Sequence, residues 1–472
     1  MLFNTLKFFV FFIVIYTLYI LLRKTHKWQN RFLLVASYFF YGSWDWRFLS
    51  LLIFSTLLDY FCGLRIYNSQ DLRKKKLFLF FSIFGNLSVL TFFKYFNFFS
   101  STLRELLSVF GFQISPSYLN IILPIGISFY TFQTMSYTID IYRGDMKPTR
   151  KFIDFALFVA FFPQLVAGPI ERARRLLPQI LNERKLTVEK LNEGFFLIAW
   201  GLFKKVFVAD NLARIVNLAF SHYLNLNGSE VLITVYAFAI QVYCDFSGYS
   251  DIARGLGKCM GFEIMINFNL PYLSKNIREF WRRWHISLSS WLRDYLYIPL
   301  GGNRGGKIRT YRNIMITMLL GGLWHGAAWN FVILGAYFGI ILIIYRMLEE
   351  KIKLERLLSE RVLSKLRIAV TFHFTSFGLL IFRSDSLKQI TAMFHTLFFN
   401  FSFSPLAFQW MVRILFFSWV LVLIEFFQYK RGESFLPIKQ ILPIRVALYL
   451  YIWYSTVIFG VTGGKEFIYF QF

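Results

Sequence analysis

The chain has 472 residues, a length that two or three soluble domains could fill, but its composition argues against such domains. Hydrophobic residues make up 56% of the chain and charged residues only 17%, against roughly 25% in a typical soluble domain. An aromatic content of 21% excludes a disordered chain. The formal net charge is +26, but the basic residues separate long uncharged blocks instead of covering one polar face, which disfavours a nucleic-acid-binding protein. We therefore expect most of the chain to lie in lipid.

The chain begins with an apolar run over residues 8–22. It lacks a small-residue cleavage site, and its main basic cluster, Arg23, Lys24 and Lys27, follows the run instead of preceding it. This order predicts a retained first helix that starts outside the cytoplasm.

Uncharged apolar blocks recur along the rest of the chain. Since one bilayer crossing takes about 20 residues, they predict roughly ten or eleven membrane helices. The blocks cover residues 8–22, 32–41, 48–64, 77–93, 121–139, 195–202 with its extension, 231–243, 313–345, 368–382, 414–424 and 442–461. Basic clusters at 73–76, 172–175 and 346–367 mark predicted cytoplasmic loops, whereas the loops 221–230 and 400–409 have no Lys or Arg and are predicted to lie outside. The predicted fold class is an all-α polytopic membrane protein with one integral membrane domain over residues 1–472.

Two of these blocks break a simple alternation of crossings. Residues 155–170 contain Pro163, Gly168 and Pro169 and have basic residues on both flanks, so we expect this block to enter and leave on the cytoplasmic side. Residues 313–345 have no Asp, Glu, Lys or Arg and would form about 50 Å of helix, more than one crossing needs. Glycines near the middle of this block predict a broken or re-entrant pair of half-helices. Irregular backbone at membrane depth needs protein or a water-filled cavity around it, so the breaks suggest an internal funnel.

His325 lies inside the charge-free block, between Trp324 and Gly326. An ionisable side chain within a membrane segment is a functional candidate, although a neutral histidine that bonds a neighbouring helix is an almost equally good explanation. The surrounding glycines, the neighbouring tryptophans and the predicted break in the helix favour a functional role for His325. A neutral imidazole in a low-dielectric site can accept a proton from a hydroxyl, so we predict that His325 is a general base.

A second cluster covers residues 278–304. Its tryptophans recur at helical spacing, which fits an amphipathic helix at the cytoplasmic interface better than a ligand site. His285 and Asp294 fit that explanation less well. Basic residues far outnumber acidic ones over residues 275–312, so the segment would attract a polyanion such as the phosphates of a coenzyme.

Three cysteines, at positions 62, 244 and 259, have neither disulfide nor metal-type spacing, so we predict neither a disulfide framework nor a metal site. We also expect no bound cofactor. Residues 301–307 match the glycine and lysine spacing of a phosphate-binding loop, but Ile308 replaces the Ser or Thr that would bind magnesium. A nucleotide triphosphatase is thus disfavoured, while phosphate contact and simple loop closure both remain open. Asp245 and Asp251 could form a proton relay, or Asp251 could pair with Arg254 or cap a helix.

Taken together, these segments resemble the membrane-bound O-acyltransferase superfamily, in its bacterial alginate O-acetyltransferase branch. The resemblance covers nearly the whole chain, is most specific over residues 244–330, and rests on residues 123–133, 137–144, 161–170, 244–251, 279–303 and 320–329. It implies a ring of membrane helices around a central funnel. It also implies that His325 is the catalytic histidine and His285 the second family histidine. The candidate donor-binding residues, in these motifs or directly next to them, are Arg282, Arg283, Asp294, Asn303, Arg304 and Trp324.

The resemblance implies a multi-pass protein of the bacterial inner membrane, in contact with membrane lipid. It would move an acetyl group from a cytoplasmic thioester, acetyl-CoA or a similar acyl donor, for O-acetylation of an exported polysaccharide such as alginate. An exported esterase-like acetyltransferase is the expected partner. The D-alanine transfer proteins of teichoic-acid modification, which use an aminoacyl carrier protein, are the second possibility within the family. Outside enzymes, a permease or polymer-export channel and a scaffold for secretion enzymes remain as alternatives.

Overall fold

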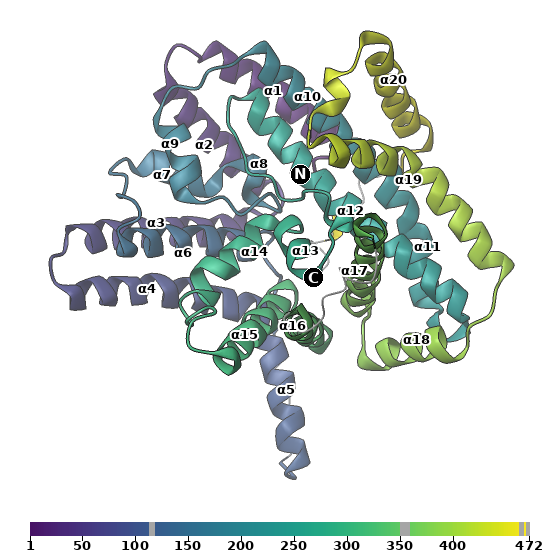
Figure 1. Ribbon diagram of the computed structural model, residues 1–472. Coiled ribbons are helices and arrows are strands. Elements are labelled where there is room, and N and C mark those ends of the chain that lie inside the picture. The colour runs from purple at the N-terminus through teal and green to yellow at the C-terminus, as the bar shows by residue number, and fades with distance from the viewer. Residues whose placement is uncertain (113–118, 350–358, 462–466, 469–472) are drawn as a thin grey trace. The chain divides into compact units, whose positions relative to one another are not determined.

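The protein is helical throughout the part of the chain that the computed structural model describes, residues 1–112, 119–349, 359–461 and 467–468 (Figure 1). The middle of the basic loop expected at 346–367 therefore lies outside the described residues. By internal contacts the chain divides into two compact units, residues 1–191 with 256–265, and residues 192–255 with 266–472. The predicted all-α membrane fold class is confirmed, and the assignment of residues 1–472 to one domain stays a prediction.

The first unit contains the amino-terminal helices. They are α1 (Leu6–Leu21), α2 (His26–Gly42), η1 (Trp46–Phe48), α3 (Leu49–Asn68), α4 (Leu72–Leu90), η2 (Thr91–Tyr95), α5 (Phe96–Val109), α6 (Ile127–Arg143), α7 (Phe152–Ala160), α8 (Phe162–Leu165) and α9 (Ala173–Leu181). Helices α3, α4 and α6 lie side by side (Figure 1). Asp59 of α3 is fully buried and accepts hydrogen bonds from Ser82 Oγ at 2.5 Å and Asn86 Nδ2 at 2.8 Å, both on α4. Such satisfied polar bonds specify how apolar helices pair.

The second unit holds the two histidines of the sequence prediction. Its helices are α10 (Val188–Leu202), which begins in the first unit, η3 (Phe203–Ala209), α11 (Asp210–Ser221), η4 (Tyr223–Asn225), α12 (Gly228–Cys259), which ends in the first unit, η5 (Pro271–Leu273), α13 (Ile277–Arg283), α14 (Ile286–Leu292), η6 (Arg293–Tyr297), α15 (Lys307–His325), α16 (Trp329–Glu349), α17 (Glu360–Arg383), α18 (Leu387–Phe399), α19 (Pro405–Arg431), η8 (Leu436–Lys439) and α20 (Leu442–Phe459). Helix α12 is 32 residues long. Its backbone packs closely against that of α10 at two glycines, where a Cβ on Gly201 would stand only 2.5 Å from the carbonyl oxygen of Gly248.

Seven helices of the described residues are long and apolar enough to cross a membrane, fewer than the ten or eleven that the sequence predicts. They cover Trp46–Asn68, Leu72–Val109, Gly228–Cys259, Trp329–Glu349, Glu360–Arg383, Pro405–Arg431 and Leu442–Phe459. Helix α1 is apolar but shorter. The difference arises because several apolar blocks form short or polar-rich helices. Residues 121–139, for example, contribute to α6, which has 17 residues and many buried Ser and Thr side chains.

Both irregular blocks are divided between two helices. That residues 155–170 enter and leave on the cytoplasmic side stays a prediction. Residues 155–170 form α7 and α8, which are separated at Phe161. Residues 313–345 lie in a hairpin of α15 and α16, which run side by side in Figure 1. These helices have 19 and 21 residues, so the expectation of half-helices is wrong. Both continue into the flanking basic segments, from Lys307 at one end to Glu349 at the other.

Glycines allow the backbones of α15 and α16 to touch. A Cβ on Gly322 would overlap the carbonyl oxygen of Phe331, and a Cβ on Gly335 would overlap that of Met318. Because backbone atoms cannot rotate away as side chains can, alanine at either position must push the helices apart.

We therefore expect Gly322→Ala and Gly335→Ala each to lower the free energy of unfolding by about 1–3 kcal/mol, the usual cost of overpacking. Thermal unfolding of the purified protein in detergent measures this. Gly85→Ala is the matched control, since its Cβ would meet only the side chain of Leu58. Equal melting temperatures for all three variants would contradict close packing of the hairpin.

Candidate active site

His325 is the last residue of α15, at the break of the hairpin. The chain leaves the helix at Gly326, whose backbone is extended, with φ −164° and ψ 155°. Phe331 packs over Gly326 so closely that a Cβ there would overlap its ring. The imidazole of His325 makes edge contacts with Trp324 and Phe382, with ring centroids 5.2 and 5.6 Å away. The end of the helix and these aromatic rings therefore define the position of His325.

His285 lies between α13 and α14, in a left-handed backbone conformation with φ 43°. It is one of only two non-glycine residues with positive φ in the described part of the chain. A non-glycine residue in this region is strained, and such strain is found most often at functional sites. The side chain is buried, with 1% exposure for the residue, and its ring meets Phe246 edge-on at 4.7 Å between centroids.

Asn267, also 1% exposed, determines which nitrogen of His285 carries the proton. Its Oδ1 accepts hydrogen bonds from the backbone N–H of Ser287 at 3.2 Å and from the Ser287 hydroxyl at 2.9 Å. Since a backbone N–H can only donate, this atom is the amide oxygen. His285 Nδ1 lies 3.2 Å from the same oxygen and must donate to it. Nε2 is then the unprotonated nitrogen of a neutral ring.

The two histidines lie close together. Their ring centroids are 6.5 Å apart, with an angle of 55° between the planes, and the indole of Trp324 contacts both rings. His285 belongs to none of the seven candidate spans. Burial, and secondly the nearby His325, lower the pKa of His285 well below its ordinary value. His285 is thus neutral near pH 7, and its Nε2 can accept a proton or a hydrogen bond.

A cavity of about 180 Å³ lies beside His325. Its walls are mainly apolar and include Leu288 of α14, Met318 of α15 and Phe338 of α16. Arg278 and Arg293 also line it. The cavity thus offers apolar walls beside an imidazole. Both arginines on its lining form ion pairs, Arg278 with Glu349 and Arg293 with Asp294, each at 2.7 Å.

The other predicted site residues lie in different places. Trp324 contacts both histidines, whereas Arg282, Arg283, Asp294, Asn303 and Arg304 lie outside the lining of the His325 cavity. Arg282, Asn303 and Arg304 are exposed. Arg283 pairs with Glu279 at 2.8 Å, and Asp294 pairs with Arg293 at 2.7 Å. Roles of these residues in substrate binding stay predictions.

Sequence reasoning did not single out Asn267, Arg278 or Arg293. Asn267 lies between apolar residues in a segment without regular periodicity, and only the fold brings it to His285. Arg278 and Arg293 belong to a basic run that the sequence identifies only as a segment. The structure shows that these two arginines line the cavity, whereas the other arginines of the run do not.

The two aspartates of α12 are held in ion pairs. Asp245 accepts a hydrogen bond from Lys205 at 2.6 Å. Asp251 pairs with Lys204 at 2.5 Å and with Arg254 at 3.0 Å. Of the alternatives open at the sequence level, the Asp251–Arg254 ion pair is present in the structure.

These features define a class of protein, a polytopic helical membrane protein in which two histidines lie close together and one of them, His325, borders a cavity. Residues 85–381 match the membrane-bound O-acyltransferase family, and the chain belongs to this family. The protein is therefore an O-acyltransferase of the membrane, as the sequence motifs predict. The alternatives of a permease, an export channel and a non-catalytic scaffold are set aside.

Three relatives indicate the range of the family around this chain. A probable alginate O-acetylase, AlgI, of Pseudomonas aeruginosa is 47% identical over 375 residues, which are 79% of this chain and 70% of the relative. A peptidoglycan O-acetyltransferase of Helicobacter pylori is 37% identical, over 78% of this chain and 73% of the relative. A teichoic acid D-alanyltransferase of Bacillus subtilis is 32% identical, over 56% of this chain and 69% of the relative.

Substitutions of Asn267 test whether this residue acts by fixing the tautomer of His285 or only by packing against it. We expect Asn267→Leu to lower kcat for acyl transfer by about 10- to 100-fold, the usual effect of removing the partner that orients a functional histidine. Asn267→Asp keeps an oxygen acceptor and retains most activity. The added carboxylate raises the pKa of His285, so the acidic limb of the pH–rate profile moves to higher pH.

Ser250→Ala is the control for Asn267, because it removes only the 3.3 Å hydrogen bond that Asn267 Nδ2 donates to Ser250. It should leave kcat and the pH profile unchanged. An Asn267→Asp enzyme with an unshifted acidic limb would mean that Asn267 does not act through His285.

Proposed function

We propose that this protein transfers an acetyl group from acetyl-CoA, supplied on the cytoplasmic side of the bacterial inner membrane, to a hydroxyl on the outer side, for O-acetylation of an exported polysaccharide such as alginate. The observation that carries the proposal is the position of His325, which borders a cavity and lies beside a second, neutral histidine. The 47% identity with a probable alginate O-acetylase supports the acetyl group and the polysaccharide.

His325 acts as the general base in this reaction. One of its nitrogens takes the proton of the acceptor hydroxyl while the oxygen attacks the thioester carbonyl. The C–O bond forms, the C–S bond breaks, and the departing thiolate takes up the proton. His285 orients the donor or assists the proton transfer through Nε2, which its contact with Asn267 leaves unprotonated.

The cavity beside His325 accommodates the acyl end of the donor. Apolar walls suit a thioester arm and exclude water, which would otherwise hydrolyse it. Arg278 and Arg293 line the same cavity and can attract the phosphates of coenzyme A. Arg282, Arg283 and Arg304 are further candidates for phosphate contacts from the sequence.

The immediate acceptor of the acetyl group is a serine of an exported esterase-like partner, which then modifies the polymer. This step follows from the family resemblance.

D-Alanyl transfer from a carrier protein is the competing function. It is supported by 32% identity with a teichoic acid D-alanyltransferase over 56% of the chain. The alginate O-acetylase matches at higher identity over 79% of the chain, and this difference favours acetyl transfer.

The assignment of the general base predicts a large effect of one substitution. His325→Ala should lower acetyl transfer from labelled acetyl-CoA by about 10²- to 10⁴-fold, the range that general base catalysis contributes. His395→Ala, which removes an exposed histidine on α18, is the matched control and should retain full activity. Full transfer by the His325→Ala protein would reject the assignment.

The donor is tested by offering the purified protein, with its polysaccharide or partner acceptor, two thioesters in parallel. We expect label to pass from acetyl-CoA and not from a D-alanyl carrier-protein thioester, because the relatives of higher identity are O-acetylating enzymes. The opposite preference would assign the protein to aminoacyl transfer.

A further inference from the structure

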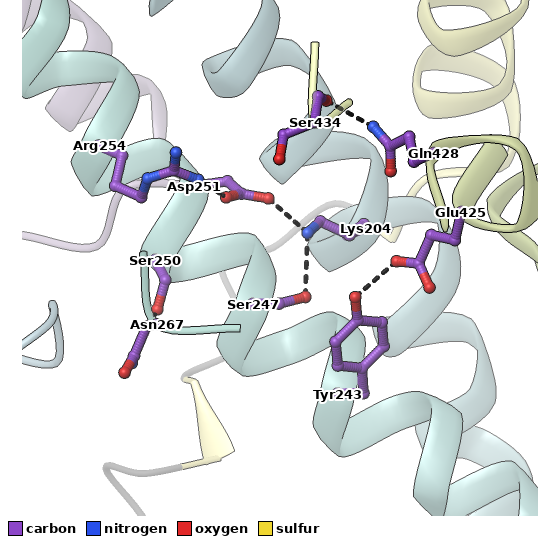
Figure 2. Close-up of polar contacts among 10 residues, drawn as sticks. All are labelled: Lys204, Tyr243, Ser247, Ser250, Asp251, Arg254, Asn267, Glu425, Gln428 and Ser434. Atoms are coloured by element: carbon purple, nitrogen blue, oxygen red, sulfur yellow. Dashed lines mark hydrogen bonds and ion pairs between the residues drawn. The ribbon is translucent and has the colours of Figure 1, made fainter. Parts of the chain in front are cut away.

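A second cavity in the second unit has a different character from the one beside His325. Its volume is about 270 Å³, and none of its lining residues borders the His325 cavity. It is built from α10, η3, α12, the segment before α13, the last residue of α13, and the end of α19 with the residues that follow it. Ionisable and hydrogen-bonding side chains from these elements line it (Figure 2). The proposed acetyl transfer assigns no ligand to this cavity.

One wall of the cavity is cationic. Lys204 and Arg254 are only 2% and 9% exposed, and both pair with a single carboxylate, that of Asp251. Figure 2 shows Asp251 between them. Lys204 also donates to Ser247 Oγ at 3.0 Å. Within the described residues the Arg254 guanidinium makes one hydrogen bond, from Nη1 to Asp251, although it has five N–H donors. Two buried cations that share one carboxylate leave positive charge for an anionic group.

The opposite wall is acidic. Glu425 of α19 accepts a hydrogen bond from the hydroxyl of Tyr243 at 2.5 Å, and Glu433 follows the end of the same helix. Figure 2 shows Glu425 and Gln428 across from Asp251 and Arg254, with Lys204 between the two sides.

The charges of the two walls balance. Two lining charges have partners of their own, since Arg283 pairs with Glu279 and Glu433 pairs with Lys439. Lys204 and Arg254 then face Asp251 and Glu425, so the formal charges cancel. In a low-dielectric site a net anion would leave a charge uncompensated, at high cost. A ligand that carries both a phosphate and an ammonium group would match both walls and keep the balance.

The surroundings of the acidic wall indicate where such a ligand comes from. Helix α19 ends with Lys430 and Arg431, and basic residues at the end of a membrane helix mark the level of the lipid headgroups. Large apolar side chains in the same turns are exposed, with 43% exposure for Phe426 and 45% for Phe427. The polar cavity thus borders a helix face that acyl chains can cover.

We propose that this cavity binds the headgroup of a zwitterionic, amine-bearing phospholipid of the phosphatidylethanolamine type. The phosphate meets Lys204 and Arg254, and the ammonium meets Glu425 and the Glu433 carboxylate, which Lys439 also contacts. The cavity has a volume of about 270 Å³, below the range of about 300–1,000 Å³ that is usual for pockets of drug-sized ligands. Its size therefore suits the headgroup alone, with the acyl chains outside.

Native mass spectrometry of the delipidated, full-length protein in detergent tests the proposal, by titration with phosphatidylethanolamine, phosphatidylcholine, phosphatidylglycerol and soluble phosphoethanolamine. One phosphatidylethanolamine should bind most tightly. Phosphatidylcholine should bind more weakly, because its trimethylammonium group cannot donate hydrogen bonds to the carboxylates. Arg254→Gln and Glu425→Gln should each weaken binding by about tenfold or more, the range for a hydrogen bond to a charged group. Arg214→Gln, at an exposed arginine of α11, should leave it unchanged.

Substitution of a buried charge could also impair folding, so a third variant leaves every charge in place. Ser434 lines the cavity from an exposed position after α19, and Ser434→Trp would fill the cavity. We expect the same loss of binding with an unchanged melting temperature in detergent. His325→Ala should bind the lipid normally, which separates this site from acetyl transfer.

Three results would overturn the proposal. If phosphatidylglycerol bound as tightly as phosphatidylethanolamine, the cavity would not select for an ammonium group, and the charge-balance argument would be wrong. Soluble phosphoethanolamine binding as tightly as the lipid would exclude the membrane as the source. Wild-type binding by a folded Ser434→Trp protein would place the lipid outside the cavity.

Discussion

The close contact between α15 and α16 determines where the proposed acyl-transfer site forms. Gly322 and Gly335 let the two backbones touch, and the chain can turn back directly after His325. The histidine is therefore held at the end of a rigid helical hairpin, beside a cavity that both helices line. A catalytic group on such a support keeps its position during the reaction, which is what efficient proton transfer requires.

The second histidine is positioned by different means. His285 has a left-handed backbone conformation, and its side chain donates to Asn267. The hydrogen bonds from Ser287 to the same oxygen determine the orientation of the amide and hence the protonated nitrogen of His285. The strained backbone and the buried polar contacts cost free energy, and they place a neutral acceptor nitrogen near His325.

The sequence predicts the class of fold and the two histidines because each leaves a local signal. Long uncharged blocks indicate membrane helices, and an ionisable residue inside such a block stands out, as His325 does. The number of membrane spans is harder to predict from the sequence, since residues 121–139 look apolar but contribute to a helix with many buried Ser and Thr side chains. The role of Asn267 and the charged cavity cannot be predicted from local sequence, because both arise from contacts between distant segments. Tyr243 and Glu425 are 182 positions apart in sequence, and no periodicity relates them.

The most direct test of the account is a cryo-electron microscopy structure of the protein with a non-hydrolysable thioether analogue of acetyl-CoA. We predict that the acyl end of the analogue lies in the cavity beside His325, within hydrogen-bonding distance of the imidazole, and that the coenzyme passes Arg278 and Arg293. Density for the analogue at another site, with the cavity beside His325 filled by side chains, would contradict the central role of this histidine.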